Sequence, residues 1–294
     1  MDPLEGITET GRRREFEILT AVQGAGPAPK AFWIEEDGGC FGRPAVIMAF
    51  APGVTNPSVA AQKVSGLGTI LGERLRLSLR GQFLDNLVGL HALDWRKADL
   101  PSFSAPDGDP KQAARWSLNY WRQLWWLDQL EPVPIMTYAE LWMDDNLPDC
   151  DDLVLTHGDY RTGNYLFDEA TGKINAMLDW ELARIGDYHE DIAWVIQRLF
   201  ATFEDGVFRA SDLYGHEEFI LAYEAASGRK VNRKTLHFYE VMCAWKMYII
   251  CAASGMSAAR AQHNHQDVLL TFTGAVGPLA TFDLCRLLKQ GARA

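Results

Sequence analysis

The segment from His157 to Asp179 carries side chains whose types and spacing suit phosphoryl transfer. Asp159 and Asn164 lie on one glycine-containing loop, and Asp179 follows after a short spacer. An amide oxygen and a carboxylate suit Mg²⁺, which takes few protein ligands and leaves its other positions to water and substrate phosphates. A second carboxylate, not needed by the metal, can accept the proton of an attacking hydroxyl. These residues are typical of a magnesium-dependent phosphate site.

The spacer between Asn164 and Asp179 predicts how these side chains meet. Residues 165–167 and 174–178 are short apolar runs typical of strands, and the polar residues 168–173 between them include a glycine suited to a turn. A hairpin returns the chain to the end at which it started. We therefore expect Asn164 and Asp179 side by side, with Asp159 on the loop that leads in.

The elements around this hairpin predict an α+β fold. A helix is expected over residues 9–23, and strands over residues 30–35 and 44–50. After Gly53 the apolar spacing becomes helical. Amphipathic helices are expected near residues 83–90, 110–129, 136–146, 187–203, 213–227, 233–255 and 278–290.

The motif at residues 157–181 resembles a known catalytic segment. His-x-Asp, an Asn five residues after the Asp, an apolar hairpin and then Leu-Asp-Trp-Glu resemble the protein-kinase-like fold, in its aminoglycoside phosphotransferase branch. The resemblance implies a two-lobe α+β fold with a small N-terminal lobe and a large, mainly helical C-terminal lobe. We expect the partial small lobe and hinge at residues 1–52 and the catalytic lobe at residues 53–294.

The resemblance also implies a role for each polar residue of the motif. Asp159 is expected to be the base that orients the substrate hydroxyl, and Asn164 and Asp179 to hold Mg²⁺. Arg161 stands where related enzymes place a cation against the transferring phosphate. His157 is expected to hold the loop in place rather than to donate a proton.

The nucleotide-binding side of the resemblance lies in the first 53 residues. Glu15, on the first expected helix, resembles the family's ion-pairing Glu. Residues 42–53 resemble the strand and hinge that receive the base of ATP or GTP through main-chain groups. The hinge residues expected to do so are Met48, Ala49, Phe50 and Ala51.

The start of the chain departs from the family pattern. In the family, the helix with the ion-pairing Glu follows a glycine-rich turn and a strand with a phosphate-binding Lys or Arg. Only 14 residues precede Glu15, and the first lysine is Lys30, beyond the helix. We therefore expect a truncated small lobe, with residue 1 not the natural beginning of the fold. The alternative is a truly degraded lobe, which would make the protein a weak or inactive nucleotide binder. An incomplete sheet exposes an edge through which copies of the chain can form a homo-oligomer.

Composition argues against several classes of protein. The net charge of −11 disfavours nucleic-acid binding, which depends on Lys and Arg contacts to phosphate. Five dispersed cysteines without a Cys-x-x-Cys pair indicate neither a disulfide framework nor a zinc site. The first residues lack the apolar core of a signal peptide, and the uncharged stretches are too short or too proline-rich to span a bilayer. We expect a cytoplasmic protein that binds neither nucleic acid nor membrane.

These observations predict a phosphotransferase that moves the γ-phosphate of ATP or GTP to a small-molecule hydroxyl. The acceptor stays open between antibiotic-like and hydroxyacyl compounds, since relatives in this branch include antibiotic kinases and kinase-like domains fused to acyl-CoA dehydrogenases. An aromatic stripe favours the apolar acceptor if it lines a pocket, although such stripes usually form core. Its members are Trp116, Tyr120, Trp121, Trp125 and Trp126.

Two other functions remain open from the sequence. One is a nucleotide-binding pseudo-enzyme that keeps the fold without turnover. The other is a metal-dependent hydrolase built on His157, Asp159 and Asp179, in which His157 would be a metal ligand.

Overall fold

The computed structural model describes residues 11–58, 67–204, 206–261, 271 and 273–291. Residues 1–10, on which the expectation about the chain start partly falls, lie outside the described residues. The chain forms two compact units. The first includes Thr10–Ala105 and Asp152–Asn232, and the second includes Pro106–Asp151 and Arg233–Ala294. The lobe boundary expected at residue 52 is a different kind of division and stays a prediction.

The first unit contains helices and short antiparallel strand pairs, so the α+β class is confirmed. Its elements are α1 (Arg12–Ala21), β1 (Ala31–Glu35), β2 (Ala45–Met48), α2 (Gly72–Ala92), η1 (Trp95–Lys97), β3 (Leu153–Thr156), β4 (Tyr165–Asp168), β5 (Lys173–Met177), η2 (Trp180–Leu182), β6 (Arg184–Asp187), α5 (Tyr188–Val195), η3 (Arg198–Phe200), β7 (Thr202–Glu204), β8 (Val207–Arg209) and α6 (His216–Ser227).

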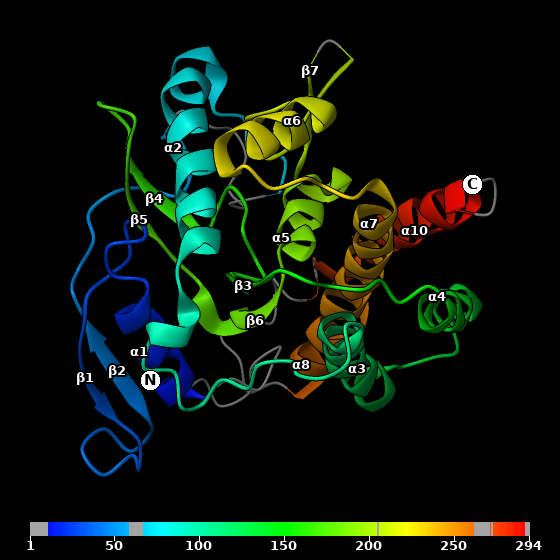
Figure 1. The fold of residues 1–294 in the computed structure, drawn as a ribbon, viewed down its shortest axis with the longest axis horizontal. Helices are drawn as coiled ribbons and strands as arrows, with labels where there is room; N and C mark the ends of the chain where they lie inside the picture. The colour runs from blue at the N-terminus through cyan, green and yellow to red at the C-terminus, as the bar shows by residue number, and fades with distance from the viewer. Residues whose placement is uncertain (1–10, 59–66, 205, 262–270, 272, 292–294) are drawn as a thin grey trace. The chain divides into compact units, whose positions relative to one another are not determined.

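The N-terminal elements form where the sequence predicts them. α1 buries Ile18 and Leu19 and packs against the β1–β2 pair (Figure 1). The two strands are antiparallel, with Glu35 opposite Ala45 and Trp33 opposite Ile47. This small layer precedes the hinge residues 48–51.

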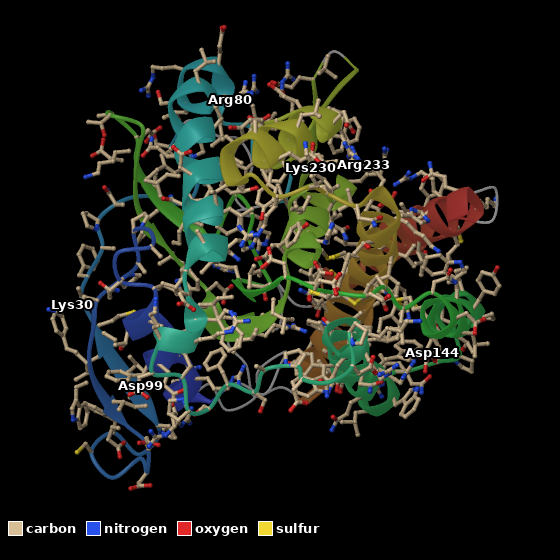
Figure 2. All side chains as sticks on the ribbon, viewed as in Figure 1. Lys30, Arg80, Asp99, Asp144, Lys230 and Arg233 are labelled. Carbon is tan, nitrogen blue, oxygen red and sulfur yellow. The ribbon has the colours of Figure 1, made fainter. Side chains whose placement is uncertain are left out.

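The long helix α2 supports the β4–β5 hairpin. Its buried residues recur at helical spacing, as expected of an amphipathic helix, and include Leu75, Leu79, Phe83, Leu87 and Leu90. It runs beside β4 and β5 (Figure 1), where Gln82 accepts from Ile174 N at 2.9 Å and donates to Gly172 O at 2.7 Å. On another face, Arg80 extends towards α6 (Figure 2) and pairs with Glu218.

The helix predicted over residues 187–203 ends early, so this part of the prediction is wrong. α5 ends at Val195, and residues 198–200 form η3 before the β7–β8 hairpin. Phe200, one of the apolar residues that suggested a longer helix, is buried by packing against Trp194 of α5, with ring centroids 5.2 Å apart. The hydroxyl of Thr202 binds the buried carboxylate of Asp212, which fixes the start of β7.

The second unit is helical in its described residues. Its elements are α3 (Gln112–Asp128), α4 (Pro134–Asp145), α7 (Arg233–Tyr248), the π-helical η4 (Ile249–Ser254), α8 (Gly255–Ala261) and α10 (Gly277–Gly291). α10 packs along α7 (Figure 1), and Arg122 of α3 pairs with Asp144 at the end of α4 (Figure 2) with an N–O distance of 2.7 Å.

The aromatic stripe of α3 contributes to the core of this unit. Trp121 is 0% exposed and Trp125 is 4% exposed, whereas Trp126 is 61% exposed. The core interpretation of the stripe therefore holds for Trp121 and Trp125, and these two rings give no support to an apolar acceptor.

One segment among the described residues, Arg233–Arg260, is long and apolar enough to cross a membrane by length and composition. Its most apolar window is 72% buried inside the protein, as in the core helix of a soluble protein, which meets the same criteria.

Candidate phosphate-transfer site

The hairpin places Asn164 beside the residue that precedes Asp179. Tyr165 pairs with Met177 at the open end of the β4–β5 ladder. One step beyond the ladder, Leu178 N donates to Asn164 O at 2.8 Å. The short spacer thus brings the two expected metal ligands together, as the sequence predicts.

The amide of Asn164 is oriented by Asp159. Its Nδ2 donates to the main-chain oxygen of Asp159 at 2.9 Å and to the carboxylate Oδ2 at 2.6 Å. Because a carbonyl and a carboxylate can only accept, the nitrogen must face Asp159 and the amide oxygen must face the other way. Asn164 Oδ1 is therefore available as an oxygen ligand for Mg²⁺.

Asp159 is surrounded by donors. Asn164 donates to Oδ2, as described above. The other oxygen, Oδ1, accepts from Arg161 Nε at 2.9 Å and from Trp194 Nε1 at 2.5 Å. Sequence reasoning missed Trp194 as a site residue. The sequence analysis places Trp194 only within the amphipathic helix expected near residues 187–203, and this spacing says nothing about where the indole nitrogen points.

Asp179 has the electrostatic environment of a cation ligand. Solvent reaches its side chain, yet protein surrounds most of the carboxyl, and this desolvation together with the negative charges of Asp159 and Glu181 raises its pKa from 3.8 to about 7. Arg161 is the one opposing charge among the causes of this shift. A divalent cation would relieve the repulsion, so the donor set of Asn164 and Asp179 fits Mg²⁺.

The backbone at Asp179 is also unusual. Its φ of 65° and ψ of 55° lie in the left-handed region, which residues other than glycine, asparagine and aspartate seldom adopt. This conformation turns the chain from the end of the hairpin into η2.

Arg161 is held between the carboxylate of Asp159 and an aromatic ring. Its Nε binds Asp159, its Nη1 donates to Thr162 O at 3.3 Å, and its guanidinium lies 5.0 Å from the centroid of Phe200. Nη2 has no partner among the described residues. This group is the part of Arg161 that is available to an anionic substrate.

The loop before Asp159 is held by hydrogen bonds to a buried carboxylate. Asp191 accepts from His157 N at 2.7 Å and from Gly158 N at 2.8 Å. Burial by itself would raise the pKa of Asp191, but the hydrogen bond and charge of His91 and the groups of His157 lower it overall. His91 in turn contacts Tyr223, with 2.7 Å between Nδ1 and the hydroxyl. This network of buried side chains fixes the backbone of the loop at His157 and Gly158.

His157 acts as a link between the two loops of the site. Its Nδ1 accepts from Asp159 N at 3.2 Å, and its Nε2 lies 3.0 Å from Leu178 O. With these partners, Nδ1 is the accepting and Nε2 the donating nitrogen of the ring. Both ring nitrogens are therefore engaged by the protein, and neither is left for a metal.

Gly158 allows the two loops to touch. Its φ is +81°, and a Cβ on it would lie 2.6 Å from Leu182 O. A side chain at this position would push the loop that carries Asp159 away from the segment that follows Asp179.

Glu15 lies near this site but has a different partner from the one expected in the family. It pairs with Arg12, one turn earlier on α1, and its charge is among the causes of the raised pKa of Asp179. Arg14 fastens the same helix to the segment after η2, because it donates to Ala183 O at 3.1 Å. α1 is thus positioned next to the Asp179 loop.

The hinge residues follow β2 and leave main-chain groups available. Ala49 N donates to Lys30 O at 2.8 Å, whereas the N–H groups of Phe50 and Ala51 have no partner among the described residues. The side chain of Phe50 is 92% exposed. Just beyond, Val54 exchanges two hydrogen bonds of 3.0 Å with Phe167 of β4. This bridge connects the segment after residues 48–51 directly to the β4–β5 hairpin.

Comparisons with curated proteins find relatives that are much longer than this chain. Acyl-CoA dehydrogenase family member 10 of Mus musculus is 29% identical over 186 residues, which cover 62% of this chain and 16% of that protein. Acyl-CoA dehydrogenase family member 11 of Homo sapiens is 24% identical over 280 residues, which cover 91% of this chain and 34% of that protein. The chain thus spans about a third or less of the length of these relatives.

Solved structures share the fold. A protein from Ralstonia eutropha, assigned to the aminoglycoside phosphotransferases, has a TM-score of 0.71 and 21% identity, covering 94% of this chain and 83% of that one. A thermostable mutant of aminoglycoside phosphotransferase APH(4)-Ia, in a ternary complex with AMP-PNP and hygromycin B, has a TM-score of 0.59 and 15% identity, covering 98% and 86%. The kinase-like fold expected from the motif is confirmed.

A family model, described as the phosphotransferase enzyme family, matches residues 2–235, which contain the loop that carries Asp159, the β4–β5 hairpin, residues 48–51 and α1. The chain belongs to the phosphotransferase enzyme family.

Proposed function

We propose that this protein transfers the γ-phosphate of ATP or GTP to a hydroxyl of a small molecule. The observation that carries the proposal is the bridging position of Asn164, whose nitrogen binds the carboxylate of Asp159 while its oxygen is left for a metal beside Asp179. A base and a metal site coupled in this way suit in-line phosphoryl transfer, in which positioning and charge stabilisation do most of the work.

The roles of the residues follow from their contacts. Asp159 orients the acceptor hydroxyl and receives its proton, and Asn164 and Asp179 hold Mg²⁺, which neutralises phosphate charge when bound. Arg161 offers Nη2 to the transferred phosphoryl group. Glu15 is the acidic residue of α1 on the nucleotide side.

The nucleotide base would bind at the hinge. Main-chain groups are presented there by Met48, Ala49, Phe50 and Ala51. The N–H of Ala49 already donates within the protein, so the N–H groups of Phe50 and Ala51 are the ones that a ligand would use. The solved relatives include complexes with AMP-PNP and with GDP, so the fold accepts both kinds of purine nucleotide.

The acceptor is a hydroxyacyl compound or an antibiotic-like molecule. The names of the curated relatives, which are acyl-CoA dehydrogenase family members, favour the hydroxyacyl class. Solved relatives with bound hygromycin B or gentamicin support the antibiotic class. We retain the hydroxyacyl class as the first to test, in a cytoplasmic setting.

The hydrolase alternative is disfavoured by His157, because both of its ring nitrogens bind the protein. In addition, the described residues contain no group of three or more His, Cys, Asp or Glu side chains that could hold a metal ion. The pseudo-enzyme alternative makes a different prediction for turnover, and the experiment below separates the two.

The test measures release of ADP or GDP with Mg²⁺ and panels of hydroxyacyl compounds and aminoglycosides. We expect turnover with at least one panel, and a loss of about 10²-fold or more in kcat for Asp159→Asn with nucleotide affinity within about threefold. Asp99→Asn, an exposed carboxylate at a distance in sequence from the motif (Figure 2), is the matched control.

Two outcomes would overturn the proposal. Wild-type protein that binds nucleotide but turns over no acceptor is a pseudo-enzyme. Hydrolysis that persists in Asp159→Asn but disappears, together with bound metal, in His157→Ala indicates the hydrolase.

A further inference from the structure

The indole of Trp194 donates to an acceptor that is unusual for a buried neutral donor. Trp194 lies on α5 and is 2% exposed, and its Nε1 is 2.5 Å from Oδ1 of Asp159. Buried indole nitrogens usually find an acceptor, but most acceptors are main-chain carbonyls. Here the acceptor is the carboxylate at the centre of the site.

The donors around Asp159 are distributed unequally between its two oxygens. Oδ1 accepts from both Trp194 and Arg161, whereas Oδ2 accepts from Asn164 alone. An ionised carboxylate offers about two lone-pair positions on each oxygen. Among the described residues, Oδ1 is therefore filled and Oδ2 retains one accepting position.

We propose that Trp194 is a positioning residue that fixes the rotation of the Asp159 carboxylate, so that Oδ2 is the atom that receives the proton of the acceptor hydroxyl. The inference rests on the proposed function and names a residue and an atom that the motif does not specify.

The proton transfer balances within phosphoryl transfer. The acceptor O–H bond breaks and its proton passes to Oδ2, while the acceptor oxygen forms a bond to the γ-phosphorus. The bond between that phosphorus and the bridging oxygen breaks, and the nucleoside diphosphate leaves with the electron pair. The proton on Oδ2 later returns to solvent or to the product phosphate.

Trp194 is suited to this task because it is neutral and packed. Its ring meets Phe200 edge to face with centroids 5.2 Å apart, and the same Phe200 lies 5.0 Å beneath the guanidinium of Arg161. A neutral donor orients the carboxylate without cancelling its charge. When Arg161 turns towards a phosphate, the indole still holds Oδ1 in place.

The kinetic test is Trp194→Phe, which keeps an aromatic ring against Phe200 and removes the N–H. Loss of a hydrogen bond to a charged group corresponds to about 10–100-fold. We expect kcat to fall by that factor, with KM for nucleotide and acceptor within about threefold. Trp95→Phe is the matched control, because Trp95 Nε1 donates to the main-chain oxygen of Leu153 at 3.0 Å.

The split between kcat and KM distinguishes positioning from simple support of the fold. A Trp194→Phe protein that melts like the Trp95→Phe control and keeps the wild-type kcat overturns the inference. A rise in KM with kcat unchanged does so as well.

A spectroscopic test is independent of turnover. The Nε1–H resonance of Trp194 is assigned in the wild-type protein by through-bond and NOE correlations. We expect Asp159→Asn to move it upfield more than the other indole resonances, because an amide is a weaker acceptor than a carboxylate. An unmoved resonance overturns the inference even if Trp194→Phe fails to fold.

The two tests also separate this inference from the proposed function. If wild-type protein lacks turnover but the resonance moves, the hydrogen bond exists while the proposed function, and with it the positioning role, is wrong. If turnover requires Asp159 but the resonance does not move, the function stands and the role of Trp194 is wrong.

Discussion

The Nδ2 atom of Asn164 lies 2.6 Å from Oδ2 of Asp159. The same rigid amide group therefore binds the proposed base through its nitrogen and offers its oxygen to the proposed metal. An amide is planar, and its nitrogen and oxygen cannot turn independently. Displacement of the base therefore redirects the oxygen that faces the metal position.

This relationship predicts a double effect of Asn164→Ala. The change removes an oxygen ligand and a donor to Asp159, so we expect the affinity for Mg²⁺ to fall by about tenfold or more and kcat to fall at saturating Mg²⁺. Turnover measured against Mg²⁺ concentration checks both effects. Asn146→Ala, which removes a 2.8 Å hydrogen bond to Trp142 O, is the control. An unchanged Mg²⁺ dependence would contradict the assignment of Asn164.

The second prediction concerns the stability of the metal-free protein. Desolvation, Asp159 and Glu181 raise the pKa of Asp179 from 3.8 to about 7, so folding disfavours its ionised form. This cost is absent below the unfolded value, grows as pH rises from 3.8, and is complete above about pH 7.

Asp179→Asn should therefore melt at a higher temperature than wild type at pH 8 without Mg²⁺, with the difference shrinking towards pH 4. Asparagine also tolerates the left-handed backbone at this position. The rise should be small, because solvent reaches the side chain and screens the repulsion. Mg²⁺-nucleotide binding should be lost. A lower melting temperature at pH 8, with Asp99→Asn unchanged, would contradict this account.

Gly158→Ala should destabilise the protein through a contact as well as through its backbone. Gly158 has a φ of +81° and Leu182 O at 2.6 Å from its would-be Cβ, whereas Gly228 has a φ of +72° and nothing within 4 Å. Both substitutions cost about 1–2 kcal/mol for the left-handed backbone. Gly158→Ala should cost about 1–3 kcal/mol more, from overpacking.

Urea denaturation of the Gly158→Ala and Gly228→Ala variants measures that difference. We also expect only Gly158→Ala to lower kcat, since it displaces the loop that carries Asp159. Equal destabilisation by the two substitutions would contradict the prediction, because it would mean that the segment at Leu182 moves away from the added Cβ with no loss of stability.

Self-association through the small strand pair is the fourth prediction. β1 and β2 form a two-stranded sheet among the described residues, and Trp33, Ile47 and Phe32 are 42%, 44% and 59% exposed on it. Exposed apolar strands tend to pair with another copy. We expect Ile47→Lys to shift the protein towards monomer in sedimentation velocity. Leu77→Lys, an exposed leucine of α2, is the control. A wild-type protein that stays monomeric at high concentration would refute the prediction.

The sequence determined those features that depend on residues close together in the chain. The hairpin between Asn164 and Asp179 is set by two apolar runs and a polar turn, and its ladder formed as predicted, one residue offset at its ends. α1, β1 and β2 also follow from local apolar spacing, and the catalytic motif was sufficient to predict the fold. Local hydrogen bonds and side-chain periodicity depend only on residues within a short window of sequence.

Only the tertiary structure decided which distant groups complete the site. The hydrogen bond from Trp194 of α5 to Asp159 joins two separate elements, and Phe200 packs on Trp194 only after α5 has ended at Val195; the apolar pattern of residues 187–203 showed neither contact. The support of the loop by Asp191 and His91 likewise joins separate elements. Such contacts depend on how helices pack around a buried carboxylate, and hydrophobic periodicity tells which face of a helix is buried but not which polar group it will meet there.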